Sequence, residues 1–422
     1  MSGAGFESEV DRRRKAVRLA VGGVPVARVA RLVGRSRWWV YEWLGRFEEF
    51  GDDGLVDQSR APLSRPSKTE QDVIDRVLAK RSELKSDPVA SIGALTILAE
   101  LEREGFDRVP SLRTIERILQ QAAVTTPSRK RDRSTEPKLP LPQVTTPGVW
   151  QQADWIQNRW LTGGIKFNSI QVTDVGSHGV ASHQYHQRTM TNAVSFLVNH
   201  AWPTLSIPQA MGIDNAFSKT THTHNPFTSW VRACLWFGTE TIVTPPGTHG
   251  WNNHVEHINN EWQKRTIWAT RFTNLDDLRK ESDRAINWLN TRRPILDPAI
   301  TGTRYPAEYI ANNKHNLRWP PPITLEDQFG TDNKITIPLA AGRITFLRHK
   351  QTNHTIEIAN HHWPIPESIP TGALIVATLT THNHQLEIRH QGEHITNHPY
   401  PIKHTITNPY YPPAEHSLLN HV

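Results

Sequence analysis

The chain has 422 residues, a formal net charge of +7 and a sequence pI of about 9.5. This length allows about two to four domains, and the basic balance fits a polyanionic partner, either nucleic acid or a membrane surface. No apolar run approaches the roughly 18–20 residues of a membrane span, and the arginine-rich start lacks the apolar stretch of a signal peptide, so we expect a soluble, cytoplasmic protein. The single cysteine, Cys234, excludes an internal disulfide and any structural zinc site that needs two or more thiolates.

The first predicted domain, residues 1–60, has the spacing of a helix-turn-helix unit. A helix over 11–21 ends at two glycines, a short helix opens at Pro25, and Ser36 is a good N-cap for a third helix that runs to about Phe47. In this geometry the first turns of the last helix enter the major groove. The candidates for DNA contact there are Arg35, Arg37, Trp38, Trp39 and Glu42. The alternative for Trp38 or Trp39 is packing inside the unit, because aromatic residues at helical spacing usually belong to the core.

A second small helical unit is predicted over residues 66–124. Apolar residues recur at helical spacing in three segments, and Ser111 is placed to cap the third. The polar face of that helix carries three candidate DNA contacts, Arg113, Thr114 and Arg117. The alternative is a spacer bundle that touches only phosphates or no DNA at all.

The stretch 125–148 is basic and rich in proline. It has too little apolar surface to fold alone. We expect an extended linker that either follows the DNA backbone or is simply solvated.

Residues 149–312 change to strands mixed with helices. Three strands are followed by alternating helices and strands, an order that describes a mixed sheet with helices on its faces. Asp154 falls in the first strand, Asp214 follows the fourth, and Glu256 lies in the first turn of a helix that begins near 252–253. Three carboxylates from separate elements suit a hard divalent cation, which prefers oxygen ligands.

Three other carboxylates compete with this set. Asp174 ends the second strand, Glu240 begins a later one, and Glu261 lies about 140° around the helix from Glu256. We favour the first set as a group of three. For any one acid taken alone, a solvated surface position is the simpler interpretation.

Histidines cluster at two places in the same region. The pairs His222 with His224 and His254 with His257 allow zinc ligation, but the C-terminal half is rich in histidine throughout, so background abundance is the simpler account. The loop beside the predicted third carboxylate holds further candidates for contact with a DNA end, namely His249, Trp251 and Asn252. Their alternative is loop packing.

Residues 330–402 alternate as five short strands separated by Gly, Asn and Pro turns. This pattern predicts a small antiparallel barrel. Its basic residues either contact phosphates or belong to solvated strand faces, and they are Arg343, Arg348, His349 and Lys350. The last stretch, 403–422, is expected to be a disordered tail.

The motifs WQQADW, GIDNAF and NHVEH contain the three favoured carboxylates in this order. NTRRP and RYPAEYI follow them, and SRWWVYEWLGRF with GLVDQSRAP precedes them. In order and context these motifs resemble insertion-sequence transposases of the retroviral-integrase (DDE, rve) superfamily with N-terminal helix-turn-helix domains. The resemblance spans nearly the whole chain.

The resemblance implies a multidomain protein in which α-helical helix-turn-helix units precede an α/β ribonuclease H-like catalytic core with a mixed sheet, and a small antiparallel β-barrel follows. It makes Asp154, Asp214 and Glu256 the catalytic residues and the ligands of two Mg²⁺ ions, with Mn²⁺ as a substitute. DNA contacts near the site would include Asn215, Trp251, Asn252, Asn253 and Lys264.

Three residues near the site depart from the family pattern. Ala216 stands where glycine is common, His257 stands where arginine often follows the glutamate, and Gln263 occupies a turn that often carries a basic residue. These changes leave the three carboxylates intact and alter only the expected DNA contacts.

The implied activity is metal-dependent cleavage at transposon ends and transfer of the freed 3′-hydroxyl into target DNA. The partners would be double-stranded DNA, as terminal inverted repeats and target, and further copies of the chain, at least a dimer on DNA. Neither a membrane nor a nucleotide cofactor is implied, and the protein would associate with the nucleoid. One alternative is a catalytically silent or domesticated helix-turn-helix regulator. Another is a ribonuclease H-like nuclease without strand transfer, which the dedicated DNA-binding units disfavour.

Overall fold

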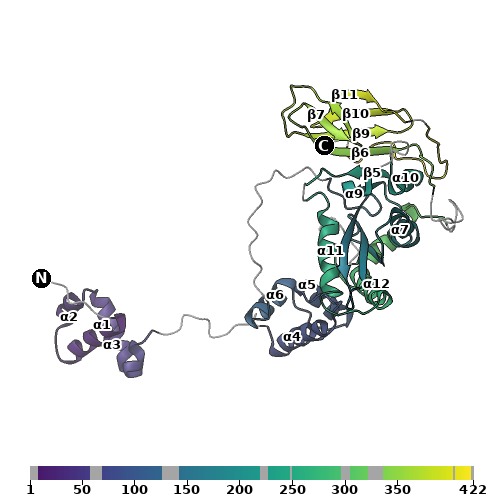
Figure 1. Cartoon of the computed structure of the whole chain (residues 1–422). Helices are drawn as coiled ribbons and strands as arrows, with labels where there is room; N and C mark the ends of the chain where they lie inside the picture. Colours follow the sequence, from purple (N-terminus) through teal and green to yellow (C-terminus); the bar gives the residue numbers. More distant parts are fainter. Residues whose placement is uncertain are drawn as a thin grey trace. The chain divides into compact units, whose positions relative to one another are not determined.

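The computed structural model describes the chain in eight stretches, residues 8–57, 69–125, 142–218, 227–247, 250–295, 305–321, 336–402 and 404–419. The chain divides into two compact units, Met1–Glu70 and Gln71–Val422, whose elements are labelled in Figure 1. Within the described stretches, no helix is long and apolar enough to cross a membrane.

The first unit contains three helices and a short 3₁₀ turn. They are α1 (Glu9–Val21), α2 (Val26–Val33), α3 (Arg37–Phe50) and η1 (Gly51–Leu55). Gly34 ends α2 with a φ of 67°, a left-handed conformation that glycine adopts without steric cost. The Ser36 hydroxyl then caps α3 by accepting a hydrogen bond from the amide of Trp39 at 3.1 Å. Small apolar residues from all three helices meet at the centre, so the expected helix-turn-helix arrangement is present.

The second unit begins with three more helices, α4 (Gln71–Ser86), α5 (Ala94–Arg103) and α6 (Leu112–Gln121). We call these helices the α4–α6 bundle. Ser111 caps α6, as expected, by accepting a hydrogen bond from the amide of Thr114 at 3.3 Å. The apolar faces of the bundle share one core with Ala285, Trp288 and Leu289 of α12 (Leu275–Thr291). The bundle is therefore packed onto the rest of the second unit.

Nine strands of the second unit form one sheet. In chain order they are β1 (Trp150–Trp160), β2 (Lys166–Asp174), β3 (Val180–Tyr185), β4 (Ala210–Ile213), β5 (Glu240–Val243), β6 (Arg343–His349), β9 (Leu374–Thr380), β10 (Gln385–His390) and β11 (Glu393–Pro399). Across the sheet the order is β11-β10-β9-β6-β5-β4-β1-β2-β3, and β7 (Thr355–Ile358) forms a separate hairpin with β8 (His361–Pro364). β2 is antiparallel to β1 and β3, whereas β4 and β5 run parallel to β1. This meander followed by parallel strands is the arrangement expected of the ribonuclease H-like core.

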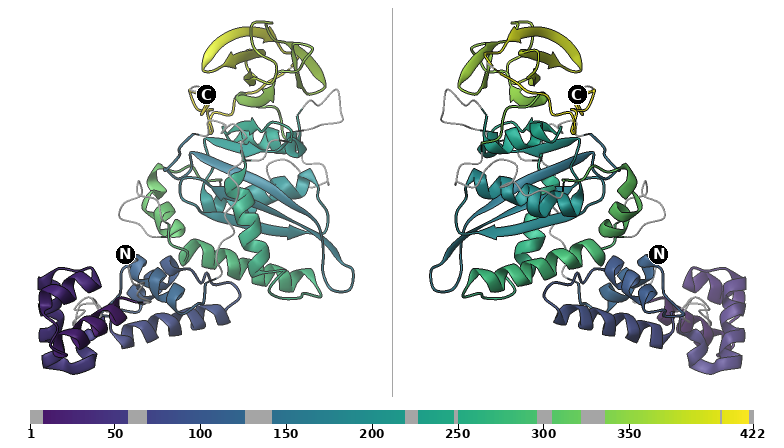
Figure 2. Two further views of the ribbon diagram at one scale, coloured as in Figure 1. Left: turned by 90° about the vertical axis from the view of Figure 1, so that its left-hand side faces the viewer. Right: turned by 90° about the vertical axis from the view of Figure 1, so that its right-hand side faces the viewer.

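Helices cover both faces of the core part of the sheet (Figures 1 and 2). One layer contains α7 (Met190–Phe196), the π-helical η2 (Leu197–Ala201), α8 (Trp202–Leu205), α9 (Asn215–Ser218) and α10 (Ser229–Trp236). The other contains α11 (Asn253–Arg265) and α12, and α13 (Pro306–Asn312) and η3 (Lys314–Asn316) follow in the chain. Ala153 and Trp155 of β1 pack with the first layer, whereas Ile156 packs with Trp262 of α11. Because side chains alternate along a strand, Asp154 lies on the α11 face.

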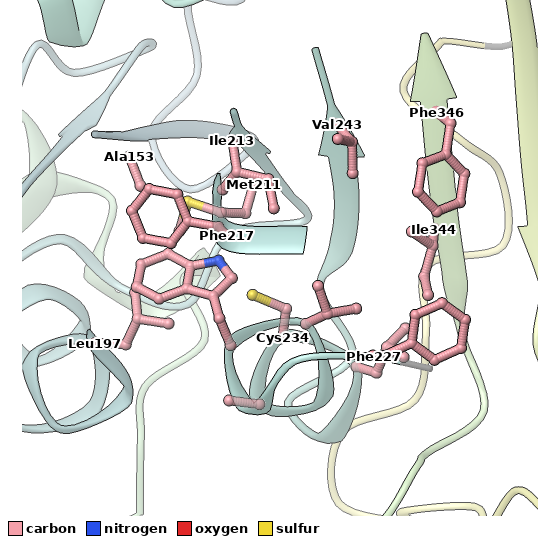
Figure 3. Packing of buried hydrophobic residues seen from close by; sticks show 14 of the residues in the cluster. Ala153, Leu197, Met211, Ile213, Phe217, Phe227, Cys234, Val243, Ile344 and Phe346 are labelled. Atoms are coloured by element: carbon pink, nitrogen blue, oxygen red, sulfur yellow. The ribbon is translucent and has the colours of Figure 1, made fainter. Parts of the chain in front are cut away.

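The C-terminal strands extend the core sheet. β6 pairs in parallel with β5 and in antiparallel with β9. Figure 3 shows Ile344 and Phe346 of β6 in the same apolar packing as Val243 of β5. The expected separate small barrel is therefore not confirmed. The physical reason is that β5 would otherwise expose a row of unpaired backbone groups, which β6 satisfies.

Residues 404–419, which we expected to be part of a disordered tail, lie against the core. The buried Glu240 carboxylate of β5 accepts hydrogen bonds from the hydroxyl of Ser417 at 2.6 Å and from the amide of Leu418 at 3.2 Å. The side chain of Asn408 donates to the carbonyl of the last residue of α10 at 2.8 Å. This segment thus adds two donors to a buried carboxylate that also accepts a hydrogen bond from the hydroxyl of Thr345 in β6.

Replacing Ser417 tests this docking. Ser417→Ala should lower the free energy of unfolding by about 1–3 kcal/mol, because a buried charged acceptor loses a donor. Tyr410→Ala in the same segment is the control. Its side chain is 85% exposed, so its effect should stay within about 0.5 kcal/mol. Urea denaturation measures both, and equal effects would contradict the docking of 404–419.

Candidate active site and DNA-binding faces

The two candidate aspartates occupy neighbouring positions in the sheet. β1 pairs with β4 in parallel, with Gln152 opposite Gly212. Continuing this register by two residues brings Asp154 level with Asp214, which directly follows β4, on strands about 4.8 Å apart. The fold therefore brings together two carboxylates that are far apart in the chain.

Hydrogen-bond donors hold both aspartates. Asp154 accepts from the amide of Trp155 at 2.8 Å through Oδ1 and from Asn259 Nδ2 at 2.7 Å through Oδ2. Asp214 Oδ1 accepts from the amide of Ala216 at 2.9 Å. Each carboxylate keeps further lone pairs for other partners.

Gln152 of β1 fixes the start of α11. Its Oε1 accepts from the amides of His254 at 3.1 Å and Val255 at 3.3 Å, and its Nε2 donates to the carbonyl of Trp251 at 2.7 Å. The first amides of a helix have no partner within the helix, so Gln152 replaces a missing side-chain cap. Glu256 is the next residue along and therefore starts from a fixed position.

Two further contacts continue along α11. Asn259 reaches Asp154, and one turn later Gln263 Oε1 accepts from the guanidinium of Arg159 at 2.8 and 3.1 Å. Together with the Gln152 contacts, these are the β1–α11 contacts. Glu256 is exposed and lies three residues before Asn259, on the same helix face. It therefore projects from the face that meets Asp154.

Negative charge at the site is not neutralised. Burial, the charge of Asp214 and a smaller effect of Glu256 raise the pKa of Asp154 to about 7. Burial also raises the pKa of Asp214, opposed by the amide of Ala216 and the charge of Arg188. This chemistry suits a cation. Among the described residues, however, no three His, Cys, Asp or Glu side chains form a group ready to hold a metal, so Glu256 does not complete a closed ligand set.

The competing carboxylates have other partners. Asp174 is buried and accepts from both the amide and the hydroxyl of Ser177 at 2.7 Å. Glu240 is held by residues 404–419, and Glu261 pairs with Arg265 at 2.6 Å. Each of the three competing carboxylates therefore has a structural role that accounts for its position.

Several residues predicted to contact DNA near the site lie inside the protein. Trp251 is 1% exposed and packs in an apolar cluster. Asn252 is buried, and its Oδ1 has no hydrogen-bond partner within the described residues. Asn215 is half-buried and accepts from Arg348 at 2.8 Å. Burial of Trp251 matches the packing alternative.

Other candidates near the site are exposed or outside the described residues. Asn253 and Lys264 are exposed on α11, and Lys264 pairs with Glu261 at 3.2 Å. Burial and the charge of His257 lower the pKa of His254. The remaining predicted histidines, His222, His224 and His249, lie outside the described residues, as does most of the basic linker.

The two tryptophans at the start of α3 have different surroundings. Trp38 is 72% exposed. Trp39 packs against the apolar core and faces Trp43 with ring centroids 6.1 Å apart. Tyr41, one turn after Trp38, is also exposed. Trp39 is thus a packing residue, and Trp38 with Tyr41 forms an aromatic surface on the helix.

The charged candidates on this helix differ in the same way. Arg37 is exposed at the first turn of α3. Arg35 pairs with Glu9 at 2.6 Å, and Glu42 pairs with Arg46 at 3.0 Å. Both pairs are partly exposed to solvent. Arg35 would have to exchange Glu9 for a phosphate in order to contact DNA.

Two of the three candidates on α6 point away from the shared core with α12. Arg113 and Arg117 are exposed, whereas the hydroxyl of Thr114 lies 3.0 Å from that of Ser111 at the helix cap. The exposed face of α6 therefore carries two arginines, with the exposed Glu116 between them.

The basic residues of the C-terminal strands mostly hold backbone carbonyls. Lys350 is 2% exposed and donates to two backbone carbonyls. Arg348 is buried and donates to the carbonyls of Thr244 and Glu357. Arg343 donates to carbonyls of the 404–419 segment. Only His349 is exposed among the four, and its Nδ1 lies 3.0 Å from a carbonyl. Arg343, Arg348 and Lys350 therefore stabilise the fold and do not form the predicted phosphate-binding face.

Two family models match the N-terminal part of the chain. A Helix-turn-helix domain matches residues 12–62 and a Homeodomain-like domain matches residues 39–119. These matches confirm the helix-turn-helix character predicted from the sequence. Among curated proteins, none matches the chain.

Solved structures with similarity to the chain include retroviral integrases. The HTLV-2 integrase catalytic core domain in complex with magnesium, in its dimeric form, is 15% identical, with 40% of this chain and 99% of that one covered and a TM-score of 0.29. The simian T-cell lymphotropic virus intasome in complex with PP2A regulatory subunit B56 gamma is 14% identical, with 66% and 87% covered and a TM-score of 0.33. At these TM-scores the likeness decides nothing by itself. The N-terminal matches show helix-turn-helix character, and the strand order shows a mixed sheet.

Three polar residues of the site were not predicted. Gln152 and Asn259 form the β1–α11 contacts, and Arg188, just before α7, donates to Gln157 of β1 at 2.8 Å. A signal for two of them exists in the sequence. Gln152 is two residues before Asp154 on the same strand face, and Asn259 is three residues after Glu256 on the same helix face.

The raised pKa of Asp154 predicts how stability depends on pH. Folding raises this pKa from 3.8 to about 7, so the folded state holds the proton more tightly. Without divalent cations, the free energy of unfolding should fall as pH rises from about 4 to about 7. Asp154→Asn should then raise it at pH 8 by roughly 1–2 kcal/mol, allowing for solvent screening of a half-buried group.

Urea denaturation in EDTA at pH 5 and pH 8 measures this effect. Asp276→Asn is the control, because that carboxylate is 80% exposed, and it should leave the pH dependence unchanged. An Asp154→Asn protein that is less stable than wild type at pH 8 would contradict the prediction.

The different surroundings of the α3 tryptophans predict opposite phenotypes. Trp39→Ala should lower the free energy of unfolding by about 2–4 kcal/mol through lost packing, whereas Trp38→Ala should change it by less than about 0.5 kcal/mol. Trp38→Ala should instead weaken binding to duplex DNA. Thermal unfolding and fluorescence anisotropy with a labelled duplex distinguish the two, and wild-type DNA affinity in Trp38→Ala would contradict an aromatic DNA contact.

Proposed function

We propose that the protein is a DDE transposase that cleaves DNA at transposon ends and transfers the freed 3′-hydroxyl into target DNA. The proposal is supported chiefly by the neighbouring positions of Asp154 and Asp214, with Glu256 on the helix that the β1–α11 contacts hold beside them. Burial first, and then the negative charge of Asp214, raise the pKa of Asp154 to about 7. A cation between the two aspartates removes the repulsion of their charges.

The donor chemistry fits Mg²⁺, which prefers carboxylate and phosphate oxygens, with Mn²⁺ as a substitute. Asp154, Asp214 and Glu256 would hold the ions. Bound in this way, such ions stabilise the charge on the attacking and leaving oxygens of an in-line displacement.

The protein's own side chains orient the site. Asn259 holds one oxygen of Asp154, and Gln152 fixes the helix start from which Glu256 projects. Arg188 supplies positive charge beside Asp214, which suits a phosphate of the bound strand. These groups set the geometry before the substrate arrives.

The chemistry consists of two displacements at phosphorus. Water attacks a phosphodiester at the element end, and the bond from phosphorus to the 3′-oxygen breaks to leave a free 3′-hydroxyl. That oxygen then attacks a target phosphodiester, and the target's own 3′-oxygen leaves with a proton. One phosphodiester replaces another in the second step, so no nucleotide cofactor is needed.

The DNA partner would be held by two helical surfaces. Arg37 and Trp38 are exposed on α3, and Arg113 and Arg117 are exposed on α6. Joining two ends of one element requires two copies of the site, so the working form would be at least a dimer on DNA.

A catalytically silent helix-turn-helix regulator is the second candidate. It is favoured by the lack of a closed three-residue ligand group among the described residues. Against it stands the repulsion between Asp154 and Asp214, since a protein without catalysis gains nothing from unpaired charges that lower its stability.

Substitution of the proposed ligands tests the activity. With Mg²⁺ and labelled duplexes copied from the DNA on either side of the gene, Asp214→Asn and Glu256→Gln should each reduce cleavage and strand transfer by about 100-fold or more. Both should bind DNA normally. Asp276→Asn is the control and should retain full activity.

Two outcomes would contradict the proposal in different ways. Unchanged products in Asp214→Asn would reject the assigned site. DNA binding by the wild-type protein without any cleavage would favour the regulator.

A further inference from the structure

The side of the α4–α6 bundle that faces α12 is buried and apolar. Ile97, Leu101 and Ile115 of the bundle are fully buried in the core that also contains Trp288 and Leu289 of α12. Separating the two parts would expose this apolar surface to water, which is unfavourable. The bundle is therefore not free to move as a separate domain.

An ion pair between the buried Glu100 and the partly exposed Arg292 reinforces this packing. Glu100 of α5 is 1% exposed and accepts two hydrogen bonds from the guanidinium of Arg292, which directly follows α12. Arg103 donates to the same carboxylate at 2.8 Å from its exposed side. Burial would raise the pKa of Glu100, but the bonds from Arg292 and Arg103 outweigh it and leave the pKa lowered. The carboxylate thus stays charged and keeps Arg292 in place.

A second joint connects the bundle to the helix of the candidate site. Arg265, the last residue of α11, is 7% exposed. It donates to the carbonyl of Val89 at 3.0 Å and to the hydroxyl of Ser91 at 2.6 Å, both in the connection between α4 and α5. Its guanidinium also lies over the ring of Trp288, 5.5 Å from the centroid. The end of α11 is therefore anchored in the bundle.

The other end of α11 is anchored at the candidate site. Its 13 residues span about 20 Å. Glu256 lies in its first turn, Asn259 contacts Asp154, and Arg265 contacts the bundle. One continuous helix thus connects the bundle with the carboxylates.

The free face of the bundle is suited to duplex DNA. Arg113 and Arg117 are exposed on α6, opposite the core shared with α12, and the Homeodomain-like match extends over this helix. Arginines on the exposed face of such a helix contact phosphates and base edges.

We propose that the α4–α6 bundle is a fixed arm of the catalytic core, which holds duplex DNA on α6 at a set distance from Asp154 and thereby determines which phosphodiester is cut. The contacts of the bundle with α11 and α12 join the DNA-binding face of α6 and the carboxylates in one rigid body. This inference rests on the proposed function for its cleavage readout, but the rigidity of the arm is independent of it.

The position of the cut tests the arm. A 5′-labelled duplex copied from the DNA beside the gene is incubated with Mg²⁺ and mapped at single-nucleotide resolution. Wild type should cut at one position. The double variant Glu100→Gln, Arg292→Gln removes both charges of the pair together, so that the buried Glu100 is not left unpaired. Its cuts should spread over several adjacent positions while total cleavage falls by less than about tenfold.

Arg103→Ala is the matched control, because it removes a bond to the same carboxylate without touching the link to α12. It should retain the single cut. A single unchanged cut position in the double variant would overturn the proposal, whether or not total cleavage falls, since a merely structural contribution lowers the amount of folded enzyme without moving the cut.

Hydrogen exchange of the wild-type protein provides a readout without cleavage. The amides of α5 and α6 should exchange as slowly as those of α12, because the arm opens only when the core opens. Exchange in the bundle at least about tenfold faster than in α12 would overturn the fixed arm. Slow amide exchange in the bundle together with absent cleavage would reject the proposed function, while the rigid attachment of the bundle would still be supported.

Discussion

The candidate site depends on the polar contacts between β1 and α11. A helix has no intrinsic reason to begin at one place along a strand, and apolar packing alone tolerates sliding. Gln152 ends that freedom by binding the first amides of α11, and Asn259 and Gln263 repeat the attachment at later turns. Because Glu256 projects from the first turn, these neutral amide side chains determine where the third carboxylate is relative to the two aspartates.

The sheet places a second constraint on the same site. β5 is four residues long, and β6 supplies its outer neighbour. From β6, Arg348 donates to the carbonyl of Thr244, which follows β5, and to the side chain of Asn215, the first residue of α9. The C-terminal strands therefore support the segment that carries Asp214. This support is structural, and the buried Arg348 supplies it.

Carboxylates in this protein fall into two groups with different physical states. Asp174, Glu240 and Glu100 are buried and fully provided with donors, which stabilises them as charged or hydrogen-bonded structural groups. Asp154 and Asp214 are held by fewer donors and lie at neighbouring positions of the sheet. Burial raises the pKa of both, and at Asp154 the charge of Asp214 adds to it. Perturbed pKa values of this kind cluster at functional sites.

Much of the fold was predictable from the sequence because it depends on local signals. Periodicity and caps located the helices of both N-terminal groups, and the order of strands and helices predicted a mixed sheet with Asp154 in the first strand and Asp214 after the fourth. That these two strands are neighbours came from the structure. The separate barrel and the disordered tail were not confirmed in the described residues. Both errors concern long-range pairing, since nothing local reveals that β6 covers the edge of β5 or that Ser417 reaches Glu240.

By itself, the sequence determined the residue types of the candidate site, the helix-turn-helix spacing and the strand that carries each aspartate. Only the tertiary structure decided which of two adjacent tryptophans, Trp38 or Trp39, is exposed. It also decided which basic side chains donate hydrogen bonds to backbone carbonyls. It also attached the α4–α6 bundle to α12. The physical reason is that burial depends on what packs against a side chain, and those partners come from distant parts of the chain.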